Sequence, residues 1–259
     1  IERTIEATGK HYTMAWPSEE HESGRPLKTS PLYERLKSGG GCFGSKFGWE
    51  RPNWFASDGV EPRDEPSYGR ANWFDHVARE HRHTREAVSL FDESSFAKYR
   101  LAGPDAEKAL SWICANDVAV PPGRLVYTQL CNRRGGIEAD LTVCRLAKDE
   151  FYIVTGTGSA ARDFNWIGRN IPDGCDVELT DVSMASAVLG LMGPLAREVL
   201  SQATDADLSS GAFPFATSRE LEIAGATVRA MRVTFVGELG WELHAPTDSA
   251  AAVYDLLME

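Results

Sequence analysis

The sequence has no apolar run near the roughly 20 residues that cross a bilayer, and its start, IERTIEATGK, lacks the apolar core of a signal peptide. It also lacks an excess of positive charge. The net charge of −11 argues against a nucleic-acid surface and against an anionic membrane surface. A small anionic ligand stays compatible with this charge, because a site can differ in sign from the whole chain.

Paired metal-binding or disulfide-forming residues are also missing. The cysteines are odd in number and none forms a C-x-x-C pair, which argues against a zinc site or a disulfide framework. His76, His81 and His83 lack the i,i+4 spacing of a helical metal site. We expect a reducing compartment in which the thiols are small buried hydrophobes, namely Cys42, Cys114, Cys131, Cys144 and Cys175.

Nucleotide-binding motifs are absent as well. GGGCFGSK, residues 39–46, has Ser45 and Lys46 in the wrong order for a phosphate loop, and we expect a flexible loop there. GTGSAA, residues 156–161, lacks the third glycine of a dinucleotide-binding turn. We therefore expect no FAD or NAD to be held by this chain through the usual fold.

The first 70 residues differ from the rest in having proline and glycine clusters and little periodicity. One short helix is predicted over 31–37, and residues 51–69 are predicted to be an extended connector, with a domain boundary near Gly69. The chain lacks an initiator methionine, so we expect it to be part of a longer protein.

After residue 70 the pattern becomes regular, and a helix capped by Asn72 is predicted first. Several predicted strands are joined by short turns, which make antiparallel neighbours. We therefore predict an α+β fold with antiparallel or mixed sheets and flanking helices. Strands are expected at 97–101, 124–131, 137–145, 151–155, 175–179, 187–192, 219–223, 227–233 and 241–244, and helices after 103, over 159–171, from 194 and over 249–258.

The stretch RGGIEADLTV, residues 134–143, indicates a turn followed by a strand with Ile137 and Leu141 on one face and Glu138 and Asp140 on the other. Asp140 is therefore either part of a solvated sheet face or the carboxylate of a site. The pattern alone leaves both readings open.

FVGELGWELH, residues 235–244, has two glycines that permit close approach of a ligand, and a carboxylate, Glu242, beside Trp241. Such a carboxylate can accept two parallel N–H groups from a flat heterocycle. The alternative is a hairpin turn followed by an edge strand with an outward glutamate. Physical arguments favour this alternative slightly.

Four stretches occur in the order seen in the glycine-cleavage T-protein (aminomethyltransferase) family: LFDESSFAKYRLAGPDAEKAL, VYTQLCNRRGGIEADLTVCRL, LGLMGPLAREVL and RVTFVGELGWELHAP. The resemblance covers about residues 70–259. GCFGSKFGWERPNWF resembles the segment that links the flavin part to the folate part in sarcosine and dimethylglycine dehydrogenases, and DLSSGAFPFATSRELEIAG points in particular to the sarcosine dehydrogenase family.

The resemblance implies a T-protein-like module that binds tetrahydrofolate, over 70–259, preceded by the end of a flavin-enzyme linking region over 1–69. It implies that Asp140 is the catalytic carboxylate, with Glu138 as its more exposed neighbour, and that Glu242 binds the pterin edge. Phe235 stands where many relatives have tyrosine. The other folate-binding residues that the resemblance implies are Tyr127, Leu141, Thr142, Thr155, Trp241, Leu243 and His244.

The resemblance also implies a division of labour. FAD would lie outside this sequence, on a flavin-dependent dehydrogenase domain of the same parent chain. A C-terminal β-barrel would follow residue 259. The implied function is one-carbon transfer from an oxidised N-methylamine to tetrahydrofolate, in bacterial cytoplasm or the mitochondrial matrix. A stand-alone aminomethyltransferase and a non-catalytic folate-binding or interaction domain are the alternatives.

Overall fold

The computed structural model describes residues 1–17 and 19–259, which form two compact units, Ile1–Ala87 and Val88–Glu259. No helix within those described ranges is long and apolar enough to cross a membrane. The predicted boundary near Gly69 concerns the functional parts of a parent protein and stays a prediction.

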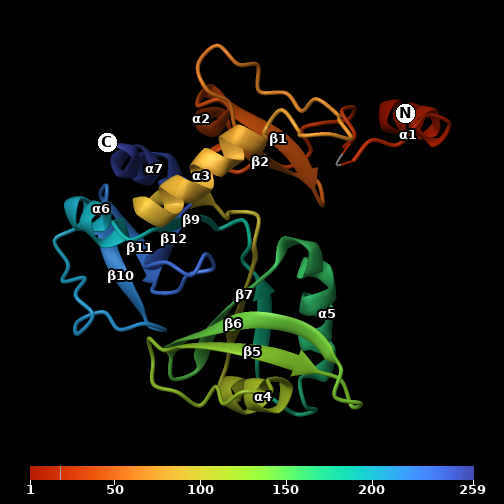
Figure 1. Ribbon diagram of the computed structural model, residues 1–259. Coiled ribbons are helices and arrows are strands. Elements are labelled where there is room, and N and C mark those ends of the chain that lie inside the picture. The colour runs from red at the N-terminus through yellow and green to blue at the C-terminus, as the bar shows by residue number, and fades with distance from the viewer. Residues whose placement is uncertain (18) are drawn as a thin grey trace. The chain divides into compact units, whose positions relative to one another are not determined.

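The first unit is built on an antiparallel hairpin of β1 (Gly41–Lys46) and β2 (Trp49–Phe55), with α2 (Tyr33–Ser38) against β1 and α3 (Phe74–Glu86) against β2 (Figure 1). Helix α1 (Glu2–His11) opens the chain. Leu32, Leu36 and Trp54 are among its buried apolar residues, and Arg25 donates to the buried carboxylate of Glu50.

Three predictions for this unit need correction. Residues 39–46 do not form a loop, because Gly41 to Lys46 pair with β2. The connector expected from residue 51 begins only after β2 ends at Phe55. Asn72 does not cap α3, since its side chain donates to the Arg63 carbonyl and accepts from the Glu65 amide, and Trp73 precedes the helix instead.

The second unit contains two five-stranded sheets whose neighbouring strands pair antiparallel throughout. The Asp140 sheet has the order β5-β6-β7-β4-β8, and the Glu242 sheet has the order β10-β11-β12-β9-β3. This confirms the α+β class with antiparallel sheets. The strands are β3 (Ser89–Asp92), β4 (Ala97–Ala102), β5 (Leu125–Cys131), β6 (Ile137–Ala147), β7 (Glu150–Thr155), β8 (Glu178–Asp181), β9 (Ser186–Met192), β10 (Ser218–Ile223), β11 (Ala226–Met231) and β12 (Gly240–Pro246).

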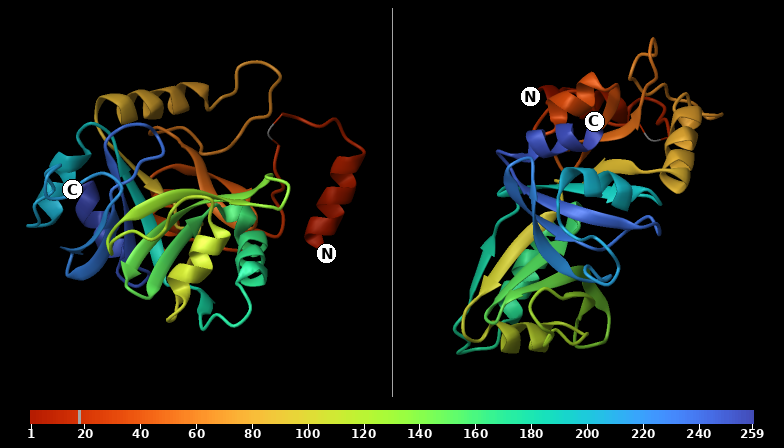
Figure 2. Two further views of the ribbon diagram at one scale, coloured as in Figure 1. Left: turned by 90° about the horizontal axis from the view of Figure 1, so that it is seen from below. Right: turned by 90° about the vertical axis from the view of Figure 1, so that its left-hand side faces the viewer.

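Helices cover the outer face of each sheet (Figures 1 and 2). Alternate residues of β4, β6 and β7 form an apolar core with α4 (Ala106–Ile113) and α5 (Ala160–Asn170), which follows the short helix η1 (Thr157–Ser159). Helices α6 (Ala196–Ala203) and α7 (Ala250–Met258) contact β12, and α7 also contacts β9. The unit therefore has the layers helix, sheet, sheet, helix.

The inner faces of the two sheets meet in a smaller apolar cluster. Leu125, Cys144, Tyr152 and Val154 of the Asp140 sheet are buried together with Met231 of the Glu242 sheet. In each antiparallel sheet, directly paired residues point to the same face. The register therefore tells which other side chains point toward the opposite sheet.

The local details of this unit agree with the sequence-based predictions, with three exceptions. The turn between β10 and β11 is the tight hairpin expected, with Ala224 and Gly225 both at positive φ as a type I′ turn requires. The strand expected at 175–179 begins only at Glu178, and β3 was not anticipated. β12 lies between β11 and β9, so the edge-strand alternative for residues 235–244 is wrong.

Candidate functional site

Asp140 lies on the inner face of its sheet. Ala139 and Leu141 are buried in the core that the sheet shares with α4 and α5, so the intervening Asp140 points the other way and is exposed. Thr142 follows on the same face, because it pairs with Val154 of the inner cluster. The carboxylate thus lies at an accessible part of the face that looks toward the Glu242 sheet.

Tyr127 is joined to Asp140 directly. Its side chain is 60% exposed, and its hydroxyl donates a hydrogen bond of 2.7 Å to Asp140 Oδ2. This hydrogen bond is the main reason why the pKa of Tyr127 is raised, so the phenol keeps its proton at neutral pH. No hydrogen bond from the described residues reaches Oδ1, which leaves that oxygen as an acceptor.

Glu138 is not the more exposed neighbour of Asp140. It is half-buried, whereas Asp140 is exposed, and Asn132 Nδ2 donates to Glu138 Oε1 at 2.8 Å. Asn132 also accepts from the amides of Arg134 and Gly136 in the turn before β6. Glu138 therefore stabilises the turn that leads into the strand.

Glu242 lies on the central strand of its own sheet, directly opposite Gly190 of β9. A Cβ at Gly190 would lie 2.8 Å from Glu93 Oε2, so the absence of a side chain there makes room for a second, buried carboxylate. Met231, the partner of Glu242 on β11, belongs to the inner cluster. Glu242 therefore also points toward the opposite sheet, with acidic and apolar neighbours.

His244 is two residues further along β12 and shares the face of Glu242. It is 4% exposed, and its Nε2 lies 3.5 Å from Glu242 Oε2, while its Nδ1 lies 3.1 Å from the hydroxyl of Tyr152 on β7. Burial is the main cause that lowers the pKa of His244. The imidazole is therefore neutral at pH 7 and links the two sheets.

Lys98 of β4 extends this polar cluster. Its side chain is fully buried, and Nζ donates to the carbonyls of Ser94 and Ser186 at 2.9 and 2.8 Å. Burial lowers the pKa of Lys98 to about 8. Sequence analysis missed Lys98, Glu93 and Tyr152. The lysine inside the apolar strand AKYRLA was the one signal that a buried polar cluster exists.

The remaining predicted folate-binding residues lie in three different surroundings. Trp241 and Leu243 are fully buried on the opposite face of β12 from Glu242. Leu141 and Thr155 belong to the face that packs on α4 and α5, where Thr155 Oγ1 donates to Asp163 Oδ2 at 2.6 Å. Phe235, in the loop before β12, is 90% exposed.

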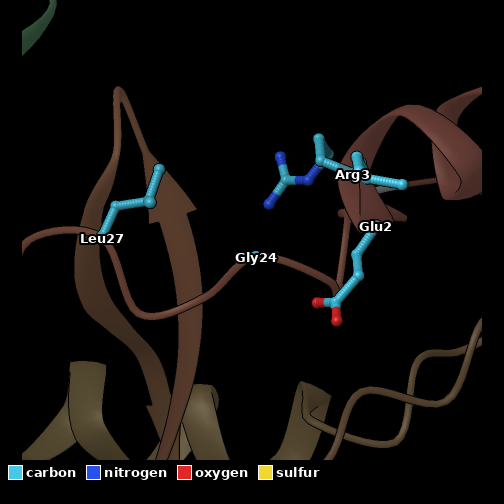
Figure 3. Close-up of a pocket in the computed structure, with 5 residues that line it drawn as sticks. Glu2, Arg3, Gly24 and Leu27 are labelled. Atoms are coloured by element: carbon cyan, nitrogen blue, oxygen red, sulfur yellow. The ribbon is translucent and has the colours of Figure 1, made fainter.

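Two hollows in the surface do not include any predicted site residue. One, of about 430 Å³, lies in the first unit and is lined by Ile1, Glu2, Arg3, Gly24 and Leu27 (Figure 3). The other, of about 410 Å³, lies beside β6, β10 and β11 and is lined by residues that include Arg145, Arg219 and Arg229. Arg229 is paired with Glu220 and Arg145 with Glu107. Neither hollow has the convergent, unpaired groups of a catalytic site.

The thiols follow the expectation in part. Cys42, Cys114 and Cys144 are buried and Cys175 is half-buried, but Cys131 at the end of β5 is exposed, so it is not a core residue. Burial is the main cause that raises the pKa of Cys42, Cys114 and Cys144 to about 11, 12 and 11. These three thiols are poor nucleophiles at neutral pH.

The chain folds into two layered antiparallel sheets that carry Asp140 and Glu242 on their facing surfaces. Residues 32–259 match the family model described as GCVT N-terminal domain, and residues 1–30 match the one described as FAD dependent oxidoreductase central domain. The chain is a member of the GCVT N-terminal domain family, a family that binds tetrahydrofolate.

Individual relatives place the chain more narrowly within this family. The chain is 42% identical to 4-methylaminobutanoate oxidase (formaldehyde-forming) of Paenarthrobacter nicotinovorans, over 99% of this chain and 31% of that protein. It is 37% identical to human mitochondrial sarcosine dehydrogenase, over 99% of this chain and 32% of that protein. The chain thus spans about a third of the length of these curated relatives and is homologous to that part of N-methylamine dehydrogenases and oxidases.

A solved structure agrees with the fold. The glycine cleavage system aminomethyltransferase T from Bartonella henselae has a TM-score of 0.73 and 30% identity, covering 90% of this chain and 57% of that one. The predicted T-protein-like fold is therefore confirmed.

Proposed function

We propose that this chain is the tetrahydrofolate-binding part of an N-methylamine-oxidising flavoenzyme of the sarcosine dehydrogenase type, and that it forms 5,10-methylenetetrahydrofolate. The observation that carries the proposal is the placement of Asp140 with Tyr127 on one sheet face and Glu242 on the face of the other sheet that looks toward it. The match of residues 1–30 supports a flavin-dependent domain in the same parent chain. We propose bacterial cytoplasm or the mitochondrial matrix as its compartment, because the relatives include a bacterial oxidase and a mitochondrial dehydrogenase.

The residues suit the reduced pterin. Glu242 is 15% exposed, and among the described residues its polar contact is His244, so its carboxylate can accept a pair of ligand N–H groups. Met231, its partner on β11, is fully buried and gives the carboxylate an apolar neighbour. Glu242 is proposed to fix the orientation of the heterocycle.

Bound tetrahydrofolate supplies the amine nitrogens that take up the one-carbon unit. Asp140 is proposed to hold or accept the proton that the reacting nitrogen loses, at Oδ1, while Tyr127 keeps Oδ2 oriented. The negative charge of Asp140 also stabilises positive charge that develops next to it. Thr142, beside Tyr127 on the paired strand, borders the same surface.

The test is calorimetric titration of the full-length protein with 5-formyltetrahydrofolate, a stable stand-in for the reduced folate. Glu242→Gln removes the charge but not the shape. Loss of a hydrogen bond to a charged group predicts a dissociation constant about 10- to 100-fold higher. Glu222→Gln, an exposed carboxylate on β10 of the same sheet, is the matched control and leaves the constant unchanged. Equal binding by wild type and Glu242→Gln would refute the assignment of Glu242.

A further inference from the structure

The buried polar cluster behind Glu242 forms a chain of contacts from one sheet to the other. Tyr152 Oη lies 3.1 Å from His244 Nδ1 and 3.4 Å from Ser186 Oγ, and His244 Nε2 lies 3.5 Å from Glu242 Oε2. His244 and Tyr152 are 4% and 8% exposed, and their rings meet edge to face at 5.4 Å. Two rings held this firmly restrict the direction in which Nε2 points.

The protonation of His244 follows from its neighbours. A neutral imidazole has one N–H and one lone pair, and a lone pair on Nε2 would face the negative carboxylate of Glu242. The proton therefore belongs on Nε2, and Nδ1 accepts from the Tyr152 hydroxyl. Burial raises the pKa of Tyr152 to about 12, so this phenol has a proton to donate. Lys98 and Arg229, the other charged groups that act on His244, are both cationic and disfavour a second proton on the ring.

A hydrogen bond from Nε2 to the Glu242 carboxylate would be favourable. At 3.5 Å the contact is longer than a good hydrogen bond, and among the described residues Nε2 has no hydrogen-bond partner. A buried donor without an acceptor is costly. A small rotation of the Glu242 carboxylate toward Nε2 removes this cost and fixes the carboxylate at one of its two oxygens.

We propose that His244 is the positioning residue of the folate site: as the Nε2–H tautomer, held by Tyr152, it orients the Glu242 carboxylate for the N–H groups of the reduced pterin. The inference rests on the proposed function of Glu242. It assigns to His244 an effect through Glu242, instead of a direct contact with ligand.

The binding test uses 5-formyltetrahydrofolate and the full-length protein with His244→Leu, His244→Gln and Tyr152→Phe. The loss of one hydrogen bond to a charged group predicts a dissociation constant raised about tenfold in His244→Leu and about threefold in Tyr152→Phe. His244→Gln places an amide N–H near the former Nε2 and is expected to restore most of the affinity.

A double-mutant cycle with Glu242 distinguishes the positioning role of His244 from a merely structural one. In a Glu242→Gln background, His244→Leu is expected to change the dissociation constant less than about twofold, because the group it acts through has lost its charge. Thr128→Val is the matched control: Thr128 is fully buried, and its hydroxyl accepts from the Asn116 amide at 3.0 Å on the outer face of β5. This variant is expected to lose stability but to keep its affinity.

The imidazole itself gives a second measurement, through its ¹⁵N chemical shifts in the wild-type protein, which distinguish a protonated from an unprotonated ring nitrogen. We expect a protonated Nε2 and an unprotonated Nδ1. The inference is overturned by a protonated Nδ1, by unchanged affinity in His244→Leu, by failure of His244→Gln to restore binding, or by an equal loss in the Glu242→Gln background. If wild type does not bind, or Glu242→Gln binds as well as wild type, the proposed function itself fails.

Discussion

Asp140 and Glu242 are both carboxylates on the facing surfaces of two five-stranded sheets, but their surroundings differ. Asp140 is exposed, and the polar partner that the structure gives it is the half-exposed Tyr127. Glu242 is largely buried, beside a buried histidine and opposite a glycine that admits another carboxylate. A carboxylate that exchanges protons needs access, whereas one that recognises a ligand needs a fixed orientation, and the two surroundings suit the roles proposed for Asp140 and Glu242.

The largest effect is expected from Asp140→Asn. Loss of a general acid–base group lowers the protein-dependent rate of 5,10-methylenetetrahydrofolate formation from formaldehyde and tetrahydrofolate by about 10²- to 10⁴-fold. Because Asp140 is exposed, the dissociation constant for 5-formyltetrahydrofolate should change much less than in Glu242→Gln. Rate assays and titrations on Asp140→Asn and Glu242→Gln test this comparison. If both variants lost rate and affinity equally, the two carboxylates would not have different roles.

The next largest effect concerns the support behind Glu242. Trp241 is fully buried, with Arg197 and Arg232 within 6 Å of its ring, so Trp241→Ala is expected to lower the free energy of unfolding by about 3–5 kcal/mol. Trp112 on α4 is 73% exposed, and Trp112→Ala should cost under about 1 kcal/mol. Urea unfolding of the two variants measures this contrast.

A smaller effect is expected in the pH dependence of stability. The pKa of Lys98 is about 8 in the folded protein against an ordinary value of 10.5, so between these values the unfolded chain binds more protons. Stability should therefore rise with pH across this window by up to about 3 kcal/mol from Lys98 alone. Lys98→Met should flatten the rise, as measured by urea unfolding from pH 7.5 to 10.5. A parallel course for both proteins would contradict the assignment.

The smallest effect is expected from Tyr127→Phe. The variant removes one exposed hydrogen bond to Asp140, so the rate should fall only a few-fold. The assay with formaldehyde and tetrahydrofolate measures this fall. An unchanged rate would mean that Tyr127 does not act on Asp140.

Local sequence patterns predict much of this fold. The alternation in IEADLTV predicted which face carries Asp140, and the Ala224-Gly225 turn predicted the β10–β11 hairpin, because both depend on near neighbours. The position of Glu242 on a central strand was not predictable in this way, since it depends on pairing with β9, about 50 residues earlier in the chain.

The failures have the same physical origin. Glycines at 39–41 and 44 suggested a loop, yet long-range pairing with β2 outweighs their intrinsic flexibility. The cluster of Tyr152, Lys98 and His244 could not be found from sequence spacing, because its members come from three strands in two sheets. The roles proposed for Asp140 and Glu242 came from family resemblance, and the structure adds the surroundings that distinguish the two residues.

Buried Lys98 can also serve as a probe of transient opening of the protein. With a pKa of about 8, Lys98 would be more reactive toward acylating reagents than an ordinary lysine, yet its amine is fully covered and bonded to two carbonyls. Acylation at this residue therefore requires transient separation of the elements around it. Ligand binding that holds the two sheets together would appear in mass spectra as slower labelling of this one amine.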